Sequence, residues 1–338
     1  MINSNSFGDL AQSFLLQRRG AALKTEMARL NQELVTGQVA DVKSLLSGNT
    51  SYIAGIENDM RRLEGYKTAT DEAAFFTDAM QSALERVQEA GTGLSQDLLT
   101  TSKNGPEPVL DQLSRNARAE LESILGSLNT FVGGRAVFGG IATGQNPVAD
   151  ADTIMMELQN ALTAAGATTV DDILTAVEAW FASPTGYAMS GYTGSPTALD
   201  PIRISADETV AVDITAENTA LRNVIQSVAT AALIEDTTVL LTVNQKRDLL
   251  DRAGIDLLGY QDGVTAIRAE IGAAQERIDR IATRNSAEAT SLEFAKGALL
   301  SADPYETATK LEEVQFQLQS LYTVTARMSD LSFVNFFR

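Results

Sequence analysis

Two stretches of the chain have residue types and spacings that could support chemistry. Asp150 and Asp152 have the spacing that opens a calcium-binding loop, but the glycine and the closing glutamate of such a loop are missing. The glycine-rich passage from Gly133 to Pro147 could cradle a phosphate. Its glycines match neither G-x-G-x-x-G nor G-x-x-x-x-G-K-[ST]. We therefore predict no metal site and no phosphate site, and expect a linker in the glycine-rich passage.

The composition removes most catalytic chemistry, because the chain has no Cys and no His. Without cysteine there is no thiol nucleophile, disulfide or thiolate metal site. Without histidine the commonest general base near neutral pH is missing. We expect a protein that is not an enzyme, with no catalytic or cofactor-binding residues and no cofactor. The alternative is a secreted enzyme with its site in the acidic segment Asp150–Tyr192.

Charge and hydrophobicity restrict the partners of the protein. The 338 residues are enough for two or three domains, and a 44% hydrophobic share with only 6% aromatic residues suits long helices. The net charge of −18 disfavours binding to nucleic acid. No apolar run approaches the roughly 20 residues of a membrane span. The start, MINSNSFGDLAQSF, lacks the basic and apolar parts of a secretory signal. A signalling coiled-coil protein, another alternative, would need one of these segments.

Both ends of the chain carry a narrow apolar stripe with alternating three- and four-residue steps, which predicts helices that pack against a partner helix. The N-terminal stripe consists of Leu16, Gly20, Leu23, Met27, Leu30 and Leu34. The C-terminal stripe consists of Leu311, Val314, Leu318, Leu321, Thr325 and Met328. Asp303 and Pro304 stand where the N-cap and first residue of the second helix are expected. Large apolar residues beside the stripes, such as Phe14 and Phe316, indicate further contacts with neighbouring molecules.

Between the ends, the pattern predicts long helices interrupted by an insert. The strongest stripe runs from Leu250 to Leu299, where only Asn285 and Glu288 are polar. Further helices are expected over about 53–102, 108–132 and 221–233. A hairpin is expected over 202–215. No Lys or Arg lies between Arg135 and Arg203, which indicates a separate segment of mixed structure.

The ends and the overall plan resemble a known family. The start MINSNSF, the helix ATKLEEVQFQLQSLYTVTARMSDLSFVNFF, the passage NTFVGGRAVFGGIATGQNPV and a variable insert are similar to the bacterial flagellin family. Within that family the chain most resembles the flagellin-like hook-associated proteins of the hook–filament junction. The segment ELVTGQVADVKSLLSGNTS lacks the paired acidic DDxAG-like signature that flagellins usually carry after the first helix.

This resemblance implies a structural subunit of the bacterial flagellum that joins the hook to the filament. The bulk filament subunit, flagellin itself, is the alternative. The resemblance also implies an extracellular location, reached through the flagellar export apparatus without a cleaved signal peptide. Implied partners are further copies in a ring or tube, the neighbouring hook-associated protein, flagellin and an export chaperone.

We predict a mainly α, elongated fold, with long antiparallel helices or coiled coil from both chain ends forming a rod and a small mixed α/β inserted outer domain. The expected domains are the terminal helices (1–45 and 301–338), the helical rod (46–140 and 206–300) and the insert (141–205). The predicted assembly contacts are Phe14, Leu16, Leu23, Met27, Leu30, Leu34, Leu311, Val314, Leu318, Leu321, Met328, Phe333, Val334, Phe336 and Phe337.

Overall fold

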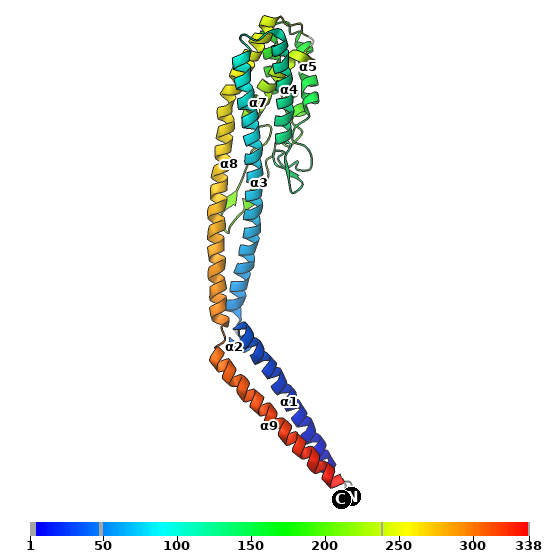
Figure 1. The fold of residues 1–338 in the computed structure, drawn as a ribbon, viewed down its shortest axis with the longest axis vertical. Helices are drawn as coiled ribbons and strands as arrows, with labels where there is room; N and C mark the ends of the chain where they lie inside the picture. The colour runs from blue at the N-terminus through cyan, green and yellow to red at the C-terminus, as the bar shows by residue number, and fades with distance from the viewer. Residues whose placement is uncertain (1–4, 47–49, 238, 337–338) are drawn as a thin grey trace. The chain divides into compact units, whose positions relative to one another are not determined.

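The fold is mainly α-helical, which confirms the predicted class (Figure 1). The computed structural model describes residues 5–46, 50–237 and 239–336. In chain order the described elements are α1 (Asn5–Thr36), α2 (Val42–Leu45), α3 (Ser51–Thr101), α4 (Glu107–Leu128), β1 (Phe131–Val132), β2 (Arg135–Ala136), α5 (Ala151–Ala165), α6 (Val170–Ala182), the π-helix η1 (Tyr187–Gly191), β3 (Ile202–Arg203), β4 (Thr209–Val210), α7 (Thr219–Asp236), α8 (Val243–Leu300) and α9 (Pro304–Phe336).

The chain divides into two compact units. Unit 1 contains residues 1–63 and 287–338, and unit 2 contains residues 64–286. Helices α3 and α8 contribute residues to both units. The predicted division into three domains remains a prediction.

Within unit 2, helices α3 and α8 are antiparallel and run side by side in Figure 1. The amide of Gln81 donates to the carbonyl of Arg268 at 2.6 Å. A Cβ atom on Gly91 would lie only 2.4 Å from the amide nitrogen of Gln261. The side chain of Gln261 therefore packs against Gly91, in the space that a larger residue would occupy. The apolar stripe predicted over Leu250–Leu299 is present in α8, and α8 begins at Val243, several residues before Leu250.

The main core of unit 2 lies where α4 and α7 pack together and α5 and α6 cover them. Leu121 and Ile124 of α4 and Val224 and Ile225 of α7 are fully buried. Helix α6 is well specified by its sequence, because Thr169 and Asp172 form a reciprocal capping box at its start. Hydrogen bonds from backbone N–H groups at this cap lower the pKa of the Asp172 carboxyl.

Carboxylates of the acidic segment serve structural contacts in unit 2. Asp150 caps α5 by accepting a hydrogen bond from the N–H of Thr153 at 2.8 Å. Its neighbour Asp152 forms an ion pair with Arg118 of α4. These contacts explain the paired spacing without a cation. In the described ranges, no group of three or more acidic side chains is placed to hold a metal ion. The same ranges contain no helix with the length and hydrophobicity to cross a membrane.

The glycine-rich passage is a folded turn, so the expectation of a linker is wrong. Strands β1 and β2 pair antiparallel across Gly133 and Gly134, whose φ angles of +57° and +78° favour glycine. A Cβ atom on Gly140 would lie 2.4 Å from the carbonyl oxygens of Ser195 and Thr197. The glycines therefore serve three left-handed backbone conformations, at Gly133, Gly134 and Gly140, and Gly140 also permits a close approach between segments.

The hairpin predicted after the insert is present and is attached to α8. Strands β3 and β4 pair with Ile202 opposite Val210, and they are shorter than the expected 202–215. Asn285 of α8 is buried and donates to the carbonyl of Ile204 at 2.8 Å. Glu208, in the hairpin turn, forms ion pairs with Arg277 and Arg284. The polar Asn285 in an otherwise apolar stripe is thus the anchor of a hairpin.

Candidate assembly surface

Helices α1 and α9 of unit 1 lie side by side and antiparallel (Figure 1). A Cβ atom on Gly20 would lie 3.3 Å from Cδ2 of Leu321, so glycine permits close approach here. At the other end of the pair, Gln38 and Ser301 form an antiparallel β-bridge. These two contacts define the register, in which the numbers of facing residues add up to about 340.

The apolar core between the two helices is small. Among the side chains that the structure describes in α1 and α9, Leu30, Leu311 and Val314 form the buried cluster, with exposed fractions of 1%, 8% and 9%. Leu23 and Met27 are half-buried and pack against that cluster. Two stripes therefore meet as predicted, but a two-helix contact covers only one side of each helix.

Farther along the pair, the two helices leave a groove of about 570 Å³ between them. Its lining includes the stripe residues Leu16, Gly20, Leu321 and Met328. Tyr322 also lines it, and the ammonium of Lys24 lies 5.8 Å from the centre of the Tyr322 ring. The stripes thus pack closely around Leu30 and less closely near Leu16.

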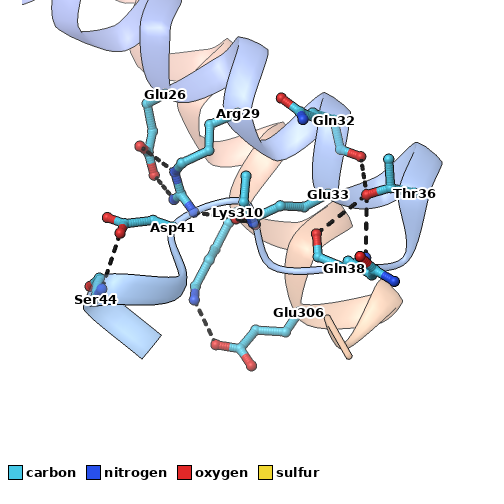
Figure 2. A network of polar contacts seen from close by, with 11 residues as sticks. Glu26, Arg29, Gln32, Glu33, Thr36, Gln38, Asp41, Ser44, Glu306 and Lys310 are labelled. Carbon is cyan, nitrogen blue, oxygen red and sulfur yellow. Dashed lines mark hydrogen bonds and ion pairs between the residues drawn. The ribbon is translucent and has the colours of Figure 1, made fainter. Parts of the chain in front are cut away.

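The turn that follows α1 is hydrogen-bonded through its backbone to the residues before α9. Figure 2 shows the polar side-chain contacts around this turn. Glu33 is 4% exposed, and its Oε1 accepts from Arg29 Nη1 at 2.6 Å and from the N–H of Ala40 at 2.9 Å. The carbonyl of Gly37, a residue with φ of +67°, accepts from the N–H of Ala302 at 2.9 Å. The Glu33 carboxylate thus holds the backbone at Ala40, seven residues later in the chain. The backbone of the turn itself is hydrogen-bonded to the residues before α9.

Charges reinforce this turn. Arg29 also bonds to Glu26, and this hydrogen bond raises the pKa of the guanidinium and lowers the pKa of the Glu26 carboxyl. On α9, the hydrogen bond from Lys310 to Glu306 raises the pKa of the Lys310 ammonium. The N–H groups of Tyr305 and Glu306 donate to Asp303 Oδ1 at 2.9 and 3.1 Å, which confirms Asp303 as the N-cap.

The predicted assembly residues occupy different environments in unit 1. Leu30, Leu311 and Val314 are buried, and the other facing residues Leu16, Leu23, Met27, Leu318, Leu321 and Met328 are half-buried. Phe14 is 65% exposed and Leu34 is 40% exposed. Helix α9 includes Phe333, Val334 and Phe336, but their side chains lie outside the described residues, and so does all of Phe337. Their role as assembly contacts remains a prediction.

Sequence reasoning did not identify the turn network of Arg29 and Glu33. The signal was present, since Glu26, Arg29 and Glu33 follow helical spacing near the end of α1. The pattern alone does not show that Glu33 is buried, because its burial depends on the turn folding back over the helix. Phe316 was noted beside the stripe and is 69% exposed.

Comparisons with known proteins point to the flagellum. Residues 260–337, which include α9 and the later part of α8, match the family model of the bacterial flagellin C-terminal helical region. No curated protein sequence matches the chain. The C-terminal part of the chain is therefore similar to the flagellin C-terminal helical region, as the sequence resemblance predicted.

Two solved structures share the fold. One is described as a flagellar hook-associated protein from Vibrio parahaemolyticus, with a TM-score of 0.52 and 14% identity over 74% of this chain and 96% of that one. The other is FlgL from Bacillus cereus, with a TM-score of 0.52 and 14% identity over 72% of this chain and 99% of that one. The predicted likeness to hook-associated proteins is thus confirmed at the level of the fold.

Proposed function

We propose that this protein is a structural subunit of the bacterial flagellum that joins the hook to the filament. The observation that carries the proposal is the flagellin C-terminal match at 260–337, because it falls on the helix α9 that pairs with α1. The two solved structures with the same fold, a flagellar hook-associated protein and FlgL, support the junction over the bulk filament.

The geometry of unit 1 supports assembly through the terminal helices. The pair buries few of its apolar residues by itself and leaves Phe14, Leu15 and Phe316 mostly exposed. Exposed apolar side chains of this size indicate an interaction surface. We place further copies of the chain on this surface, together with the neighbouring hook-associated protein and flagellin at the two ends of the junction.

The proposal includes an extracellular protein that is not an enzyme. It reaches its place through the flagellar export apparatus, with the help of an export chaperone. The structural roles of Asp150 and Asp152 support the proposal that the protein is not an enzyme. In the acidic segment Asp150–Tyr192, these two carboxylates serve a helix cap and an ion pair.

Deleting the gene and imaging the cells by electron microscopy tests the proposal. Cells without a junction protein should keep their hooks, lack filaments and release flagellin into the medium. Restoring the wild-type gene should restore filaments. Intact filaments in the deletion strain would contradict the junction role, and short or absent filaments without released flagellin would favour the filament subunit instead.

A further inference from the structure

The outer sides of α1 and α9, which face away from their mutual contact, carry related pairs of residues. On α1, Phe14 is 65% exposed and Arg18, one turn later, is exposed. On α9, Phe316 is 69% exposed and Glu312, one turn earlier, is exposed. Each outer side thus presents an aromatic ring next to a charge, and the two charges have opposite signs.

The order of these residues permits one contact that satisfies both pairs. In α1 the ring comes four residues before the charge, and in α9 it comes four residues after it. Two antiparallel helices run in opposite directions, so Phe14 can face Phe316 while Arg18 faces Glu312. Residues four apart lie on the same side of a helix, which keeps both contacts on one face.

The same contact is impossible within one molecule. In the internal register, Gly20 faces Leu321 and Gln38 faces Ser301, and these positions lie on the sides that the helices turn toward each other. Among the side chains that the structure describes, Arg18 and Glu312 form no ion pair with each other or with a third residue. The two charges are therefore available to another molecule.

We propose that α1 of one copy packs against α9 of a second, parallel copy through Phe14–Phe316 and Arg18–Glu312. This inference rests on the proposed assembly function and names its contact. The required register differs from the internal one by about 10 residues, which is on the order of 15 Å at 1.5 Å per residue. Such a contact uses different surfaces on the two copies and shifts each copy along the axis. It therefore builds a helical arrangement rather than a flat ring.

Charge reversal tests the pairing in the full-length protein. The self-association of purified chain is measured by sedimentation velocity over a range of concentrations, and assemblies are imaged by electron microscopy. R18E and E312R each place like charges together, so each should raise the concentration needed for association about tenfold. The effect should shrink as the salt concentration rises.

Restoration separates a pairwise contact from general damage. The double variant R18E/E312R should associate like wild type, and so should an equal mixture of the two single variants, because both arrangements restore opposite charges. E89R changes the sign of an exposed residue of unit 2 and should leave association unchanged. Circular dichroism of each variant monitors the helical content of the free chain.

The outcomes distinguish this contact from the function it serves. If wild-type chain associates and neither single variant differs from it, the contact is wrong while the assembly function stands. If the single variants fail and neither the double variant nor the mixture recovers, the pairing is also wrong. Variants that lose filaments in cells but associate normally when purified would assign this surface to a different protein, which would overturn the proposal.

Discussion

The helix pairs α4–α7 and α1–α9 use similar apolar spacing but bury very different amounts of it. Around α4 and α7, Leu121, Ile124 and Val224 are almost completely inaccessible, because α5 and α6 cover the pair. Around α1 and α9, within the described part of the chain, the buried apolar cluster consists of Leu30, Leu311 and Val314. Burial of apolar surface supplies most of the favourable free energy of folding. The first pair therefore gains much more stability from its own apolar contacts than the second does.

The largest expected effect comes from the covered pair. Leu121→Ala should lower the free energy of unfolding of unit 2 by about 2–5 kcal/mol, because Leu121 is fully buried and its removal leaves a cavity. Trp180, the only tryptophan, lies in α6, so its fluorescence during urea denaturation reports on unit 2. The matched control is Val109→Ala, which like Leu121 lies in α4 but is 39% exposed. This control should lower the free energy of unfolding by about 0.5 kcal/mol or less. Equal losses from both variants would contradict the stated core.

A smaller loss is expected at the hairpin of unit 2. Asn285→Ala should cost about 1–3 kcal/mol, because the carbonyl of Ile204 loses its buried donor. Hydrogen exchange should show reduced protection in β3 and β4, while the α4–α7 core keeps its protection. Glu288→Ala, one stripe position later and exposed, should leave the hairpin unchanged. A hairpin with unaltered exchange in N285A would show that Glu208 and the surrounding apolar residues suffice to hold it.

Truncating a buried side chain of the α1–α9 pair should affect unit 1 and leave the stability of unit 2 unchanged. Leu311→Ala should weaken the α1–α9 contact by about 1.5–3 kcal/mol, since a side chain of its described buried apolar cluster is truncated. Hydrogen exchange in α1 and α9 should accelerate, and self-association should be lost. The Trp180 transition should not shift, because it reports on unit 2. The control Gln315→Ala changes an exposed position of α9. A shifted Trp180 transition in L311A would contradict the independence of the two pairs.

The sequence predicted the helices well because their apolar spacing is regular over many turns. The 3-4 stripes locate α8 and α9, and Asp303 with Pro304 marks the start of α9. Spacing also indicated which residues of α1 and α9 would face each other. It did not separate the buried Leu30 from the exposed Leu34, because the stripe ends where α1 gives way to the turn at Gly37.

Features that depend on distant residues could not be predicted. Asn285 looked like an interruption of a stripe, and only the position of Ile204 explains it. The glycines from Gly133 onward looked like a linker. At position 140, however, the nearby carbonyl oxygens of Ser195 and Thr197 leave no room for a side chain, so a glycine is needed there. The burial of Glu33 likewise follows from a turn that closes over it. In each case the decisive neighbour lies outside the local pattern, so periodicity contains no information about it.

The smallest expected effect is a difference in acid sensitivity between the two units. The hydrogen bond from Arg29 lowers the pKa of Glu26 from its ordinary value of 4.5. A lowered pKa means that the ionised form stabilises the folded state, so this stabilisation is complete above about pH 4.5 and is lost as the pH falls through the folded value. In unit 2 the pKa is lowered for the carboxyls of Asp150 and Asp172, whose ordinary pKa is 3.8. The helix caps that these two residues form should therefore persist to lower pH than the contact of Glu26.

A third carboxyl in unit 2, Asp256, widens this difference in acid sensitivity. Burial raises the pKa of Asp256, with a further increase from the charge of Glu178, so protonation of Asp256 favours the folded state as the pH falls. Hydrogen exchange measured between pH 6 and 3, corrected for intrinsic rates, should therefore show the end of α1 opening before the starts of α5 and α6. E26Q should remove the acid-dependent part of the change in α1. If α1 and α6 lost protection together, the turn around Glu33 would owe its order to the backbone bonds at Gly37 and Ala302 rather than to the charges of Glu26 and Arg29.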